Sequence, residues 1–119
     1  MNYKQKVGQF GESLATQYLL KKGYAIIERN KRISYQEIDI VAKIKDKTVF
    51  IEVKTRTNDS SGFAEEAINK NKVRNMKKAI ASYVYLKKLD LDRAQFDVIV
   101  VKIDKLNKVA KIKHYLKIF

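Results

Sequence analysis

Residues 37–56 read EIDIVAKIKDKTVFIEVKTR and contain two runs in which side chains alternate with the period of a β-strand. In residues 37–44 the alternation puts Asp39, with Val41 and Lys43, opposite an apolar face of Ile38, Ile40, Ala42 and Ile44. In residues 48–55 it puts Glu52 and Lys54 opposite an apolar face of Val49, Ile51 and Val53. Because only three residues separate the two runs, they predict a β-hairpin.

The register of this hairpin determines which charged side chains meet. A two-residue turn at 45–46 places Asp39 directly across from Glu52, with both side chains on one face. A turn at 46–47 pairs Asp39 with Lys54 on that face instead, whereas a three-residue loop separates these side chains. Two of the simplest registers therefore bring two carboxylates and one ammonium group together.

Two carboxylates and a lysine in this arrangement suit the hydrolysis of a phosphodiester bond. Asp39 and Glu52 would supply half of a site for Mg²⁺ (or Mn²⁺), which water and phosphate oxygens complete. Such a metal lowers the pKa of a bound water, and Lys54 would orient that water or stabilise the transition state. The alternative is a solvated sheet face with a cross-strand salt bridge. Since about two acid-x-lysine triplets are expected by chance, the triplet has meaning only in its context on a strand.

The rest of the chain predicts a single mixed α/β domain over residues 1–119. A first helix ends near Gly23 and carries the apolar stripe Val7, Phe10, Leu14 and Tyr18. A second helix, over residues 69–88, carries the stripe Val73, Met76, Ile80 and Val84. Further strands are expected over 24–29, 96–103 and 109–119, with a loop over 57–62 and a turn over 104–108. The predicted order is helix, three strands, helix, two strands.

The composition excludes several classes of site. The 119 residues include no cysteine and one histidine, which excludes disulfide scaffolds, thiolate zinc sites, iron–sulfur clusters and multi-histidine metal sites. His114 has apolar neighbours on its strand face, so we expect a packed or surface histidine rather than a catalytic one. The longest apolar run, residues 98–101, is far short of a membrane span, and residues 1–11 lack the apolar stretch of a signal peptide. We expect a cytoplasmic protein with no membrane partner.

The charge balance favours a polyanionic partner, because 26 basic residues against 13 acidic ones give a net charge of +13. In the second helix, Tyr85 and five basic residues share an arc separate from the apolar stripe, the five being Lys70, Arg74, Lys77, Lys78 and Lys88. The last strand adds Lys111, Lys113 and Lys117. These patches suit contacts with the phosphate backbone of DNA that read no sequence; the alternative is a set of solvated faces. A membrane-surface role ranks third, since this helix lacks the aromatic and leucine-rich face of an interfacial anchor.

Several short motifs are spread over nearly the whole chain. They are Gly8-x-x-Gly11-Glu12-x-x-Ala15, Asn30, Glu37-Ile38-Asp39, Phe50-Ile51-Glu52-Val53-Lys54-Thr55-Arg56, Gly62, Glu66-Ala67, Lys72 and Phe96-Asp97. Together they resemble the YraN family, small bacterial proteins related to Holliday-junction resolvases. The resemblance implies a restriction-endonuclease-like fold, a mixed sheet flanked by helices, and the resolvase analogy implies a homodimer. It also implies that Asp39 and Glu52 bind the metal, that Lys54 is the catalytic lysine and that Glu12 is a first-helix glutamate approaching the site.

Two departures from the family pattern lie near Asp39. Ile38 stands where the wider nuclease motif often has proline, and Gln36 stands where a glycine is common. Two glutamates also have a second interpretation. Glu12 could be a capping or dipole residue of its helix, and Glu37 could be a further carboxylate beside Asp39 or a strand-end charge.

Two functions stay open at this point. The first is a magnesium-dependent endonuclease that acts on DNA, with branched or damaged structures as candidate substrates. The alternative is a non-catalytic nucleic-acid-binding protein that retains a nuclease fold. The presence of Asp39, Glu52 and Lys54 together favours the first, because a site without catalytic activity has no physical need for all three.

Overall fold

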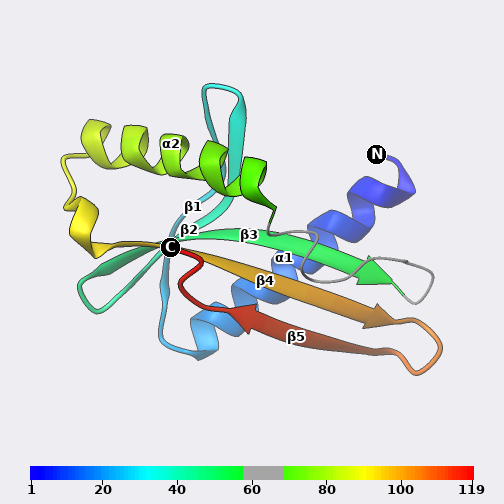
Figure 1. Ribbon diagram of the computed structural model, residues 1–119. Coiled ribbons are helices and arrows are strands. Elements are labelled where there is room, and N and C mark those ends of the chain that lie inside the picture. Colours follow the sequence, from blue (N-terminus) through cyan, green and yellow to red (C-terminus); the bar gives the residue numbers. More distant parts are fainter. Residues whose placement is uncertain (58–68) are drawn as a thin grey trace.

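The computed structural model of the protein describes residues 1–57 and 69–119, so most of the loop predicted over 57–62 lies outside the described residues, as do the motif residues Gly62, Glu66 and Ala67. In the described part, five strands form one mixed sheet with a long helix on each side (Figure 1). The elements follow the predicted order: α1 Tyr3–Lys21, β1 Ala25–Ile33, β2 Gln36–Ile44, β3 Lys47–Thr57, α2 Lys70–Leu86, β4 Ala94–Asp104 and β5 Val109–Tyr115. No helix in these two described ranges combines the length and the apolar character that crossing a membrane requires.

The sheet has the order β1-β2-β3-β4-β5. Neighbouring strands are antiparallel except β3 and β4, which are parallel and are joined through the segment that contains α2. The β2–β3 hairpin pairs Ile44 with Lys47 across a two-residue turn, and its pairing continues as far as Ile40 and Ile51. The first of the two hairpin registers is therefore confirmed.

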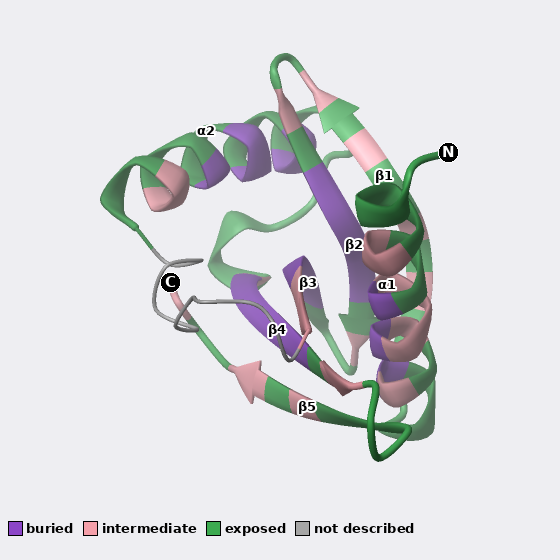
Figure 2. Ribbon diagram, turned by 90° about the vertical axis from the view of Figure 1, so that its right-hand side faces the viewer, coloured by how far each residue is buried: buried purple, intermediate pink, exposed green. Residues whose placement is uncertain are grey.

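Two buried clusters lie between the sheet and its helices (Figure 2). The cluster under α2 joins Phe50 and Phe96 to three residues of the predicted stripe, Met76, Ile80 and Val84. Ala79 and Tyr83 of the helix also belong to it, whereas Val73 of the predicted stripe is only partly buried. The cluster under α1 joins Ala15 and Leu19 to the other face of β3, namely Val49, Ile51 and Val53. The alternation predicted for β3 is thus confirmed, and it assigns Phe50 and Ile51 to opposite sides of the sheet.

β2 departs from the predicted alternation at the candidate site. Ile38 belongs to the cluster under α2, whereas Ile40 belongs to the cluster under α1. The prediction that both lie on one face is therefore wrong. On the neighbouring strand β1, Asn30 has a φ of 53° and interrupts the paired residues opposite Asp39. A left-handed residue disturbs a regular ladder, and the faces of β2 change over at Asp39.

Two strand ends also differ from prediction. β1 continues beyond residue 29 because a two-residue turn at 34–35 lets Ile33 pair with Gln36, so the chain turns here without the glycine common in the family. Ser34 takes a φ of 56° in that turn. β5 ends at Tyr115 rather than near residue 119, because Lys117 takes a φ of 54°, which extended strands do not tolerate.

The predicted stripe of α1 is only partly correct, because Leu14 and Tyr18 pack against the cluster under α1 without being fully buried. Phe10 is 53% exposed, and the buried residues are Gly11, Ala15 and Leu19. The reason is a close approach to the sheet, since a Cβ added at Gly11 would lie 1.9 Å from Thr55 Oγ1. Small side chains are therefore needed where α1 meets β3. The predicted helix end is confirmed, as Gly23 has a φ of 95° immediately after the capping residue.

We expect Gly11→Ala to lower the free energy of unfolding by about 1–3 kcal/mol, because the added methyl group overlaps Thr55. Gly8→Ala is the matched control in the same helix, since a Cβ at Gly8 meets nothing within 4 Å. That variant should gain up to about 1 kcal/mol from helix propensity. Urea unfolding of both variants measures the difference, and effects of the same sign would contradict the close approach of α1 to β3.

Candidate active site

An open cavity of about 570 Å³ contains all four residues that the sequence analysis named as catalytic. Its walls come from α1, β2 and β3, with Glu12, Asp39, Glu52 and Lys54 among the lining residues. The convergence of these side chains was predicted from the hairpin register and the resemblance. The structure brings all four together.

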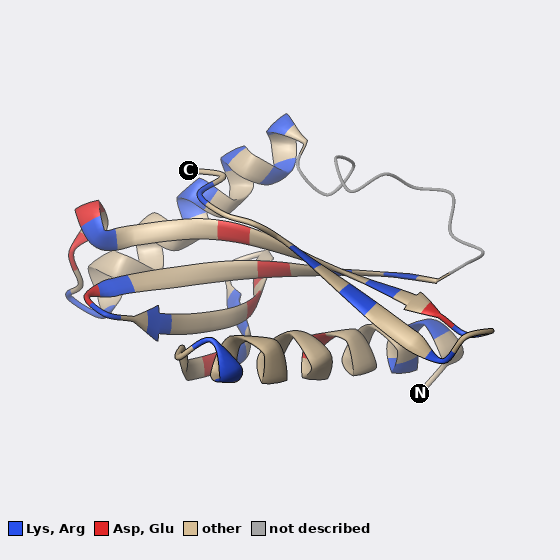
Figure 3. Cartoon of the chain, turned by 90° about the horizontal axis from the view of Figure 1, so that it is seen from below, with Lys and Arg blue, Asp and Glu red and all other residues tan. Residues whose placement is uncertain are grey.

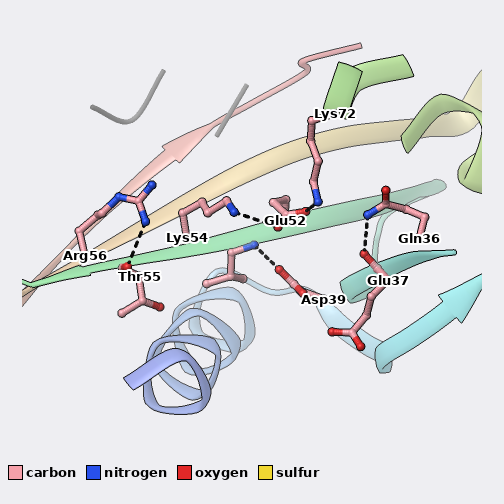
Figure 4. A network of polar contacts seen from close by, with 9 residues as sticks. Gln36, Glu37, Asp39, Glu52, Lys54, Thr55, Arg56 and Lys72 are labelled. Atoms are coloured by element: carbon pink, nitrogen blue, oxygen red, sulfur yellow. Dashed lines mark hydrogen bonds and ion pairs between the residues drawn. The ribbon is translucent and has the colours of Figure 1, made fainter. Parts of the chain in front are cut away.

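Asp39 lies just beyond the last pair of the β2–β3 ladder. Its Oδ2 accepts a hydrogen bond of 2.7 Å from the backbone N–H of Val53, so the carboxylate bridges to β3 where backbone pairing has stopped (Figure 4). Asp39 is 9% exposed. This hydrogen bond fixes the direction of the carboxylate. No contact with Oδ1 is found among the described residues, so this oxygen can accept a ligand.

Glu52 is the more buried carboxylate and faces two lysines (Figure 4). Lys72 Nζ lies 3.0 Å from Oε2, and Lys54 Nζ lies 3.9 Å from Oε1. The contact with Lys72 is an ion pair without hydrogen-bond geometry, because Oε2 is buried and has no hydrogen-bond partner. Among the described residues, the partners of Glu52 are thus held to it by charge.

Sequence reasoning assigned no role in the site to Lys72, although it is one of the residues that match the family. The position of Lys72 in the helical repeat could have indicated that it faces the sheet. Lys72 lies four residues before Met76 and seven before Ala79, both buried, so it belongs to the sheet-facing side of α2 and not to the exposed basic arc. A lysine on an apolar stripe indicates a buried negative partner, and here that partner is Glu52.

Glu12 lies in the middle of α1, which excludes the capping interpretation. The helix is capped instead by Asn2, whose side chain accepts from Gln5 N–H, and the first turn contains no acidic residue. Glu12 Oε1 is 3.7 Å from an Arg29 nitrogen but has no hydrogen-bond partner. Burial raises the pKa of Glu12, the Arg29 charge opposes this shift and the Glu37 charge adds to it.

The carboxylates of the site repel one another. Burial and then the charge of Glu52 raise the pKa of Asp39 to about 8, while the hydrogen bond from Val53 opposes the shift. Glu12 and Glu37 add smaller raising effects. The side chain of Glu37 is exposed, and its charge acts on the pKa of Asp39. The raised pKa of Asp39 means that its negative charge is disfavoured here, so a proton or an added cation would stabilise this carboxyl group.

The donor set fits a hard divalent cation. Both ligands predicted for the metal are carboxylates, and a buried carboxylate oxygen without a hydrogen bond is found on Glu52. Within the described residues, no three acidic, histidine or cysteine side chains are close enough to share one metal. Asp39 and Glu52, the two carboxylates that the sequence analysis assigned to a metal, therefore have no third side chain of these types beside them in this part of the chain.

The basic residues predicted to bind nucleic acid are spread along α2 (Figure 3). All members of the predicted arc are exposed: Lys70, Arg74, Lys77, Lys78, Tyr85 and Lys88. Lys88, however, lies beyond the end of α2 and has a φ of 55°, so it is not on the helix as predicted. The second patch is less coherent, because Lys111 and Lys113 lie on β5 whereas Lys117 lies beyond its end. The helix that carries the basic arc also carries Lys72 into the carboxylate site.

His114 is a packed residue, as expected. Its Nε2 is 2.7 Å from Asp97 Oδ2, and its Nδ1 is 3.0 Å from the hydroxyl of Tyr18. Asp97 is fully buried and also accepts hydrogen bonds from Gln95 Nε2 and the backbone N–H of Lys117. This polar network joins α1, β4 and the chain after β5, and none of its residues lines the 570 Å³ cavity.

The fold is similar to solved structures of restriction-endonuclease-like proteins. A fdxN element excision controlling factor protein from Anabaena variabilis gives a TM-score of 0.54 at 12% identity, covering 88% of this chain and 97% of that one. An XisH family protein from Nostoc punctiforme gives 0.53 at 12% identity, covering 88% and 98%. These neighbours confirm the predicted fold class, a restriction-endonuclease-like mixed sheet flanked by helices.

Sequence relatives extend over the full chain. UPF0102 proteins from Caldicellulosiruptor bescii and Syntrophomonas wolfei are 46% and 39% identical, over 94% and 97% of this chain and 94% and 98% of their own. One from Clostridioides difficile is 39% identical over 100% of both chains. Residues 11–101 match the model of the uncharacterised protein family UPF0102. The chain therefore belongs to UPF0102, which is the YraN family that its motifs resemble.

Proposed function

We propose that the protein is a Mg²⁺-dependent (or Mn²⁺-dependent) endonuclease that holds DNA by its phosphate backbone and hydrolyses phosphodiester bonds. One observation carries this proposal. Two buried carboxylates, Asp39 and Glu52, meet with Lys54 in an open cavity at the end of a strand ladder. Burying two like charges together is costly unless a cation or a proton offsets them, and such costs concentrate at functional sites.

Asp39 and Glu52 would hold the metal, which supplies a more acidic water and offsets charge on the phosphoryl group. Asp39 is oriented for this role by the Val53 N–H. Glu52 has the ammonium groups of Lys72 and Lys54 beside it, and they offset its charge in the absence of a metal. Both carboxylates come from strands of the sheet, and rigid elements hold a ligand more accurately than loops do.

Lys54 has the freedom that its role requires. Its ammonium is 3.9 Å from Glu52 Oε1 and its side chain is 35% exposed, so it can reach a phosphate oxygen in the cavity. There it would stabilise the negative charge that develops in the transition state. Glu12 is a positioning residue in this scheme, because its charge acts on Asp39 while its own ion pair is with Arg29.

The basic arc of α2 would hold the duplex. Replacing Lys70, Arg74, Lys77 and Lys78 together by alanine should weaken DNA binding and make the slope of log affinity against log salt shallower by about 3. Filter binding or fluorescence anisotropy over a salt series measures the slope. An unchanged slope in the quadruple variant would show that this face does not contact DNA.

The direct test of the proposal is a cleavage assay with Mg²⁺ or Mn²⁺ on linear, nicked, flapped and four-way DNA. Metal-dependent cleavage of any of these that is lost in Glu52→Gln supports the endonuclease. The second candidate function is a nucleic-acid-binding protein without turnover. It is supported by the basic arc alone, because binding by these residues does not require the carboxylates. Salt-dependent DNA binding without cleavage in wild-type protein would establish that alternative.

A further inference from the structure

We propose that Lys72 is the resident counter-cation of Glu52. In the metal-free protein its ammonium occupies the charge position that a divalent cation takes over, and on exchange it becomes available to a DNA phosphate. The inference deepens the proposed function and rests on it, since it concerns how the same site receives its metal.

The first support is the geometry of the ion pair. Lys72 Nζ is 3.0 Å from a buried oxygen of Glu52, closer than Lys54 is to the other oxygen. Yet this oxygen lacks a hydrogen-bond partner, and the Lys72 side chain is 26% exposed. An ammonium placed by charge, with a partly open path to solvent, can leave when a stronger cation arrives.

The second support is where Lys72 is anchored. It lies in the first turn of α2, where its backbone N–H donates to the capping side chain of Asn69. Its neighbours Lys70 and Arg74 lie on the exposed basic face of the same helix. A small rotation of one flexible side chain therefore moves the charge from the carboxylate toward the face that we propose binds DNA.

The third support is the electrostatic need for such a cation. Glu52 is 5% exposed, and a buried carboxylate without a partner is strongly destabilising. Two lysines meet this need at Glu52, whereas Asp39 receives a backbone N–H and no ammonium among the described contacts. In the metal-free site, lysines therefore lie beside Glu52 only. A metal on Glu52 would repel both of them, and Lys72 more strongly because its ammonium is the closer one.

A structural salt bridge and an exchangeable counter-cation predict opposite changes in metal affinity. If Lys72 only supports the fold, its loss loosens the site and weakens metal binding. If it competes with the metal, its loss removes both a competitor and a repulsive charge, and metal binding tightens. The sign of the change therefore separates the two roles.

The experiment titrates the purified full chain with Mn²⁺ alone, following free Mn²⁺ by electron paramagnetic resonance. Lys72→Met removes the charge and keeps the length of the side chain, and we expect it to bind Mn²⁺ about tenfold more tightly than wild type. Lys72→Arg keeps the charge and should bind like wild type. Lys70→Met, two residues away on the exposed face, is the matched charge control and should change Mn²⁺ affinity less than about twofold.

Weaker or unchanged Mn²⁺ binding in Lys72→Met would overturn the counter-cation role while leaving the metal site standing. No Mn²⁺ binding by either wild type or Lys72→Met would overturn the metal site itself, and the counter-cation with it. A measurement on wild type serves if Lys72→Met does not fold. Mg²⁺ should shift the Lys72 Cε–Hε resonance and leave that of Lys22 in place, and a Lys72 signal that does not respond would reject the exchange.

Discussion

Glu52→Gln is expected to lower the rate of phosphodiester hydrolysis by about a thousandfold while the protein keeps its fold. The amide retains the shape of the side chain but removes one of the two negative charges that hold the metal. DNA binding without metal should persist or tighten slightly, because one negative charge near the phosphates is lost. Single-turnover cleavage with Mg²⁺, across several DNA structures, measures the rate, and circular dichroism checks the fold.

The matched control for this variant is Asp92→Asn, which removes one negative charge from an exposed position outside the site. Its cleavage rate should equal that of wild type. Equal residual cleavage in wild type and Glu52→Gln would point to a contaminating nuclease and would leave the binding protein as the function of this chain.

Glu52→Gln also has a readout that does not depend on activity. The charge of Glu52 is the second cause, after burial, of the raised pKa of Asp39, which is about 8. Removing that charge should return the pKa of Asp39 toward its ordinary acidic range, so Asp39 ionises at lower pH in the variant. An NMR titration of the Asp39 carboxyl carbon follows this shift, and an unchanged pKa would mean that the two carboxylates do not interact.

The second large effect is expected for Lys54→Ala, which should lower the cleavage rate by about a hundredfold and leave metal affinity nearly unchanged. Lys54 is assigned to the transition state, and its ammonium is farther from Glu52 than that of Lys72. Rates at saturating DNA, together with Mn²⁺ titration of the same protein, separate the two effects. The contrast with Lys72→Met, for which metal affinity changes, makes the pair of lysines a matched comparison.

A wild-type rate in Lys54→Ala would remove this lysine from the catalytic group. A loss of rate that is fully restored by raising the Mn²⁺ concentration would instead assign Lys54 to metal binding. Either outcome contradicts the role proposed here, because a group that acts on the transition state lowers the rate at every metal concentration.

The local part of this architecture is determined by the sequence itself. Alternation with a period of two and a connection of three residues specify the β2–β3 hairpin, because both depend on neighbouring residues alone. The sequence left the register of this hairpin open between two turns, and the structure has the turn at 45–46, which brings Asp39 close to Glu52. The exposed arc of α2 follows in the same way from helical periodicity.

The tertiary structure decided what depends on how elements meet. Gly11 against Thr55 sets which face of α1 is buried, and the adjacent Glu12 then lies beside the site. A left-handed residue on β1 opposite Asp39 accompanies the change of face that strict alternation did not predict. The crossover from β3 to β4 carries α2 over the sheet and delivers Lys72 to Glu52. These contacts join residues that are far apart in the chain. They are stabilised by close packing and by charge interactions, which a local sequence pattern does not reveal.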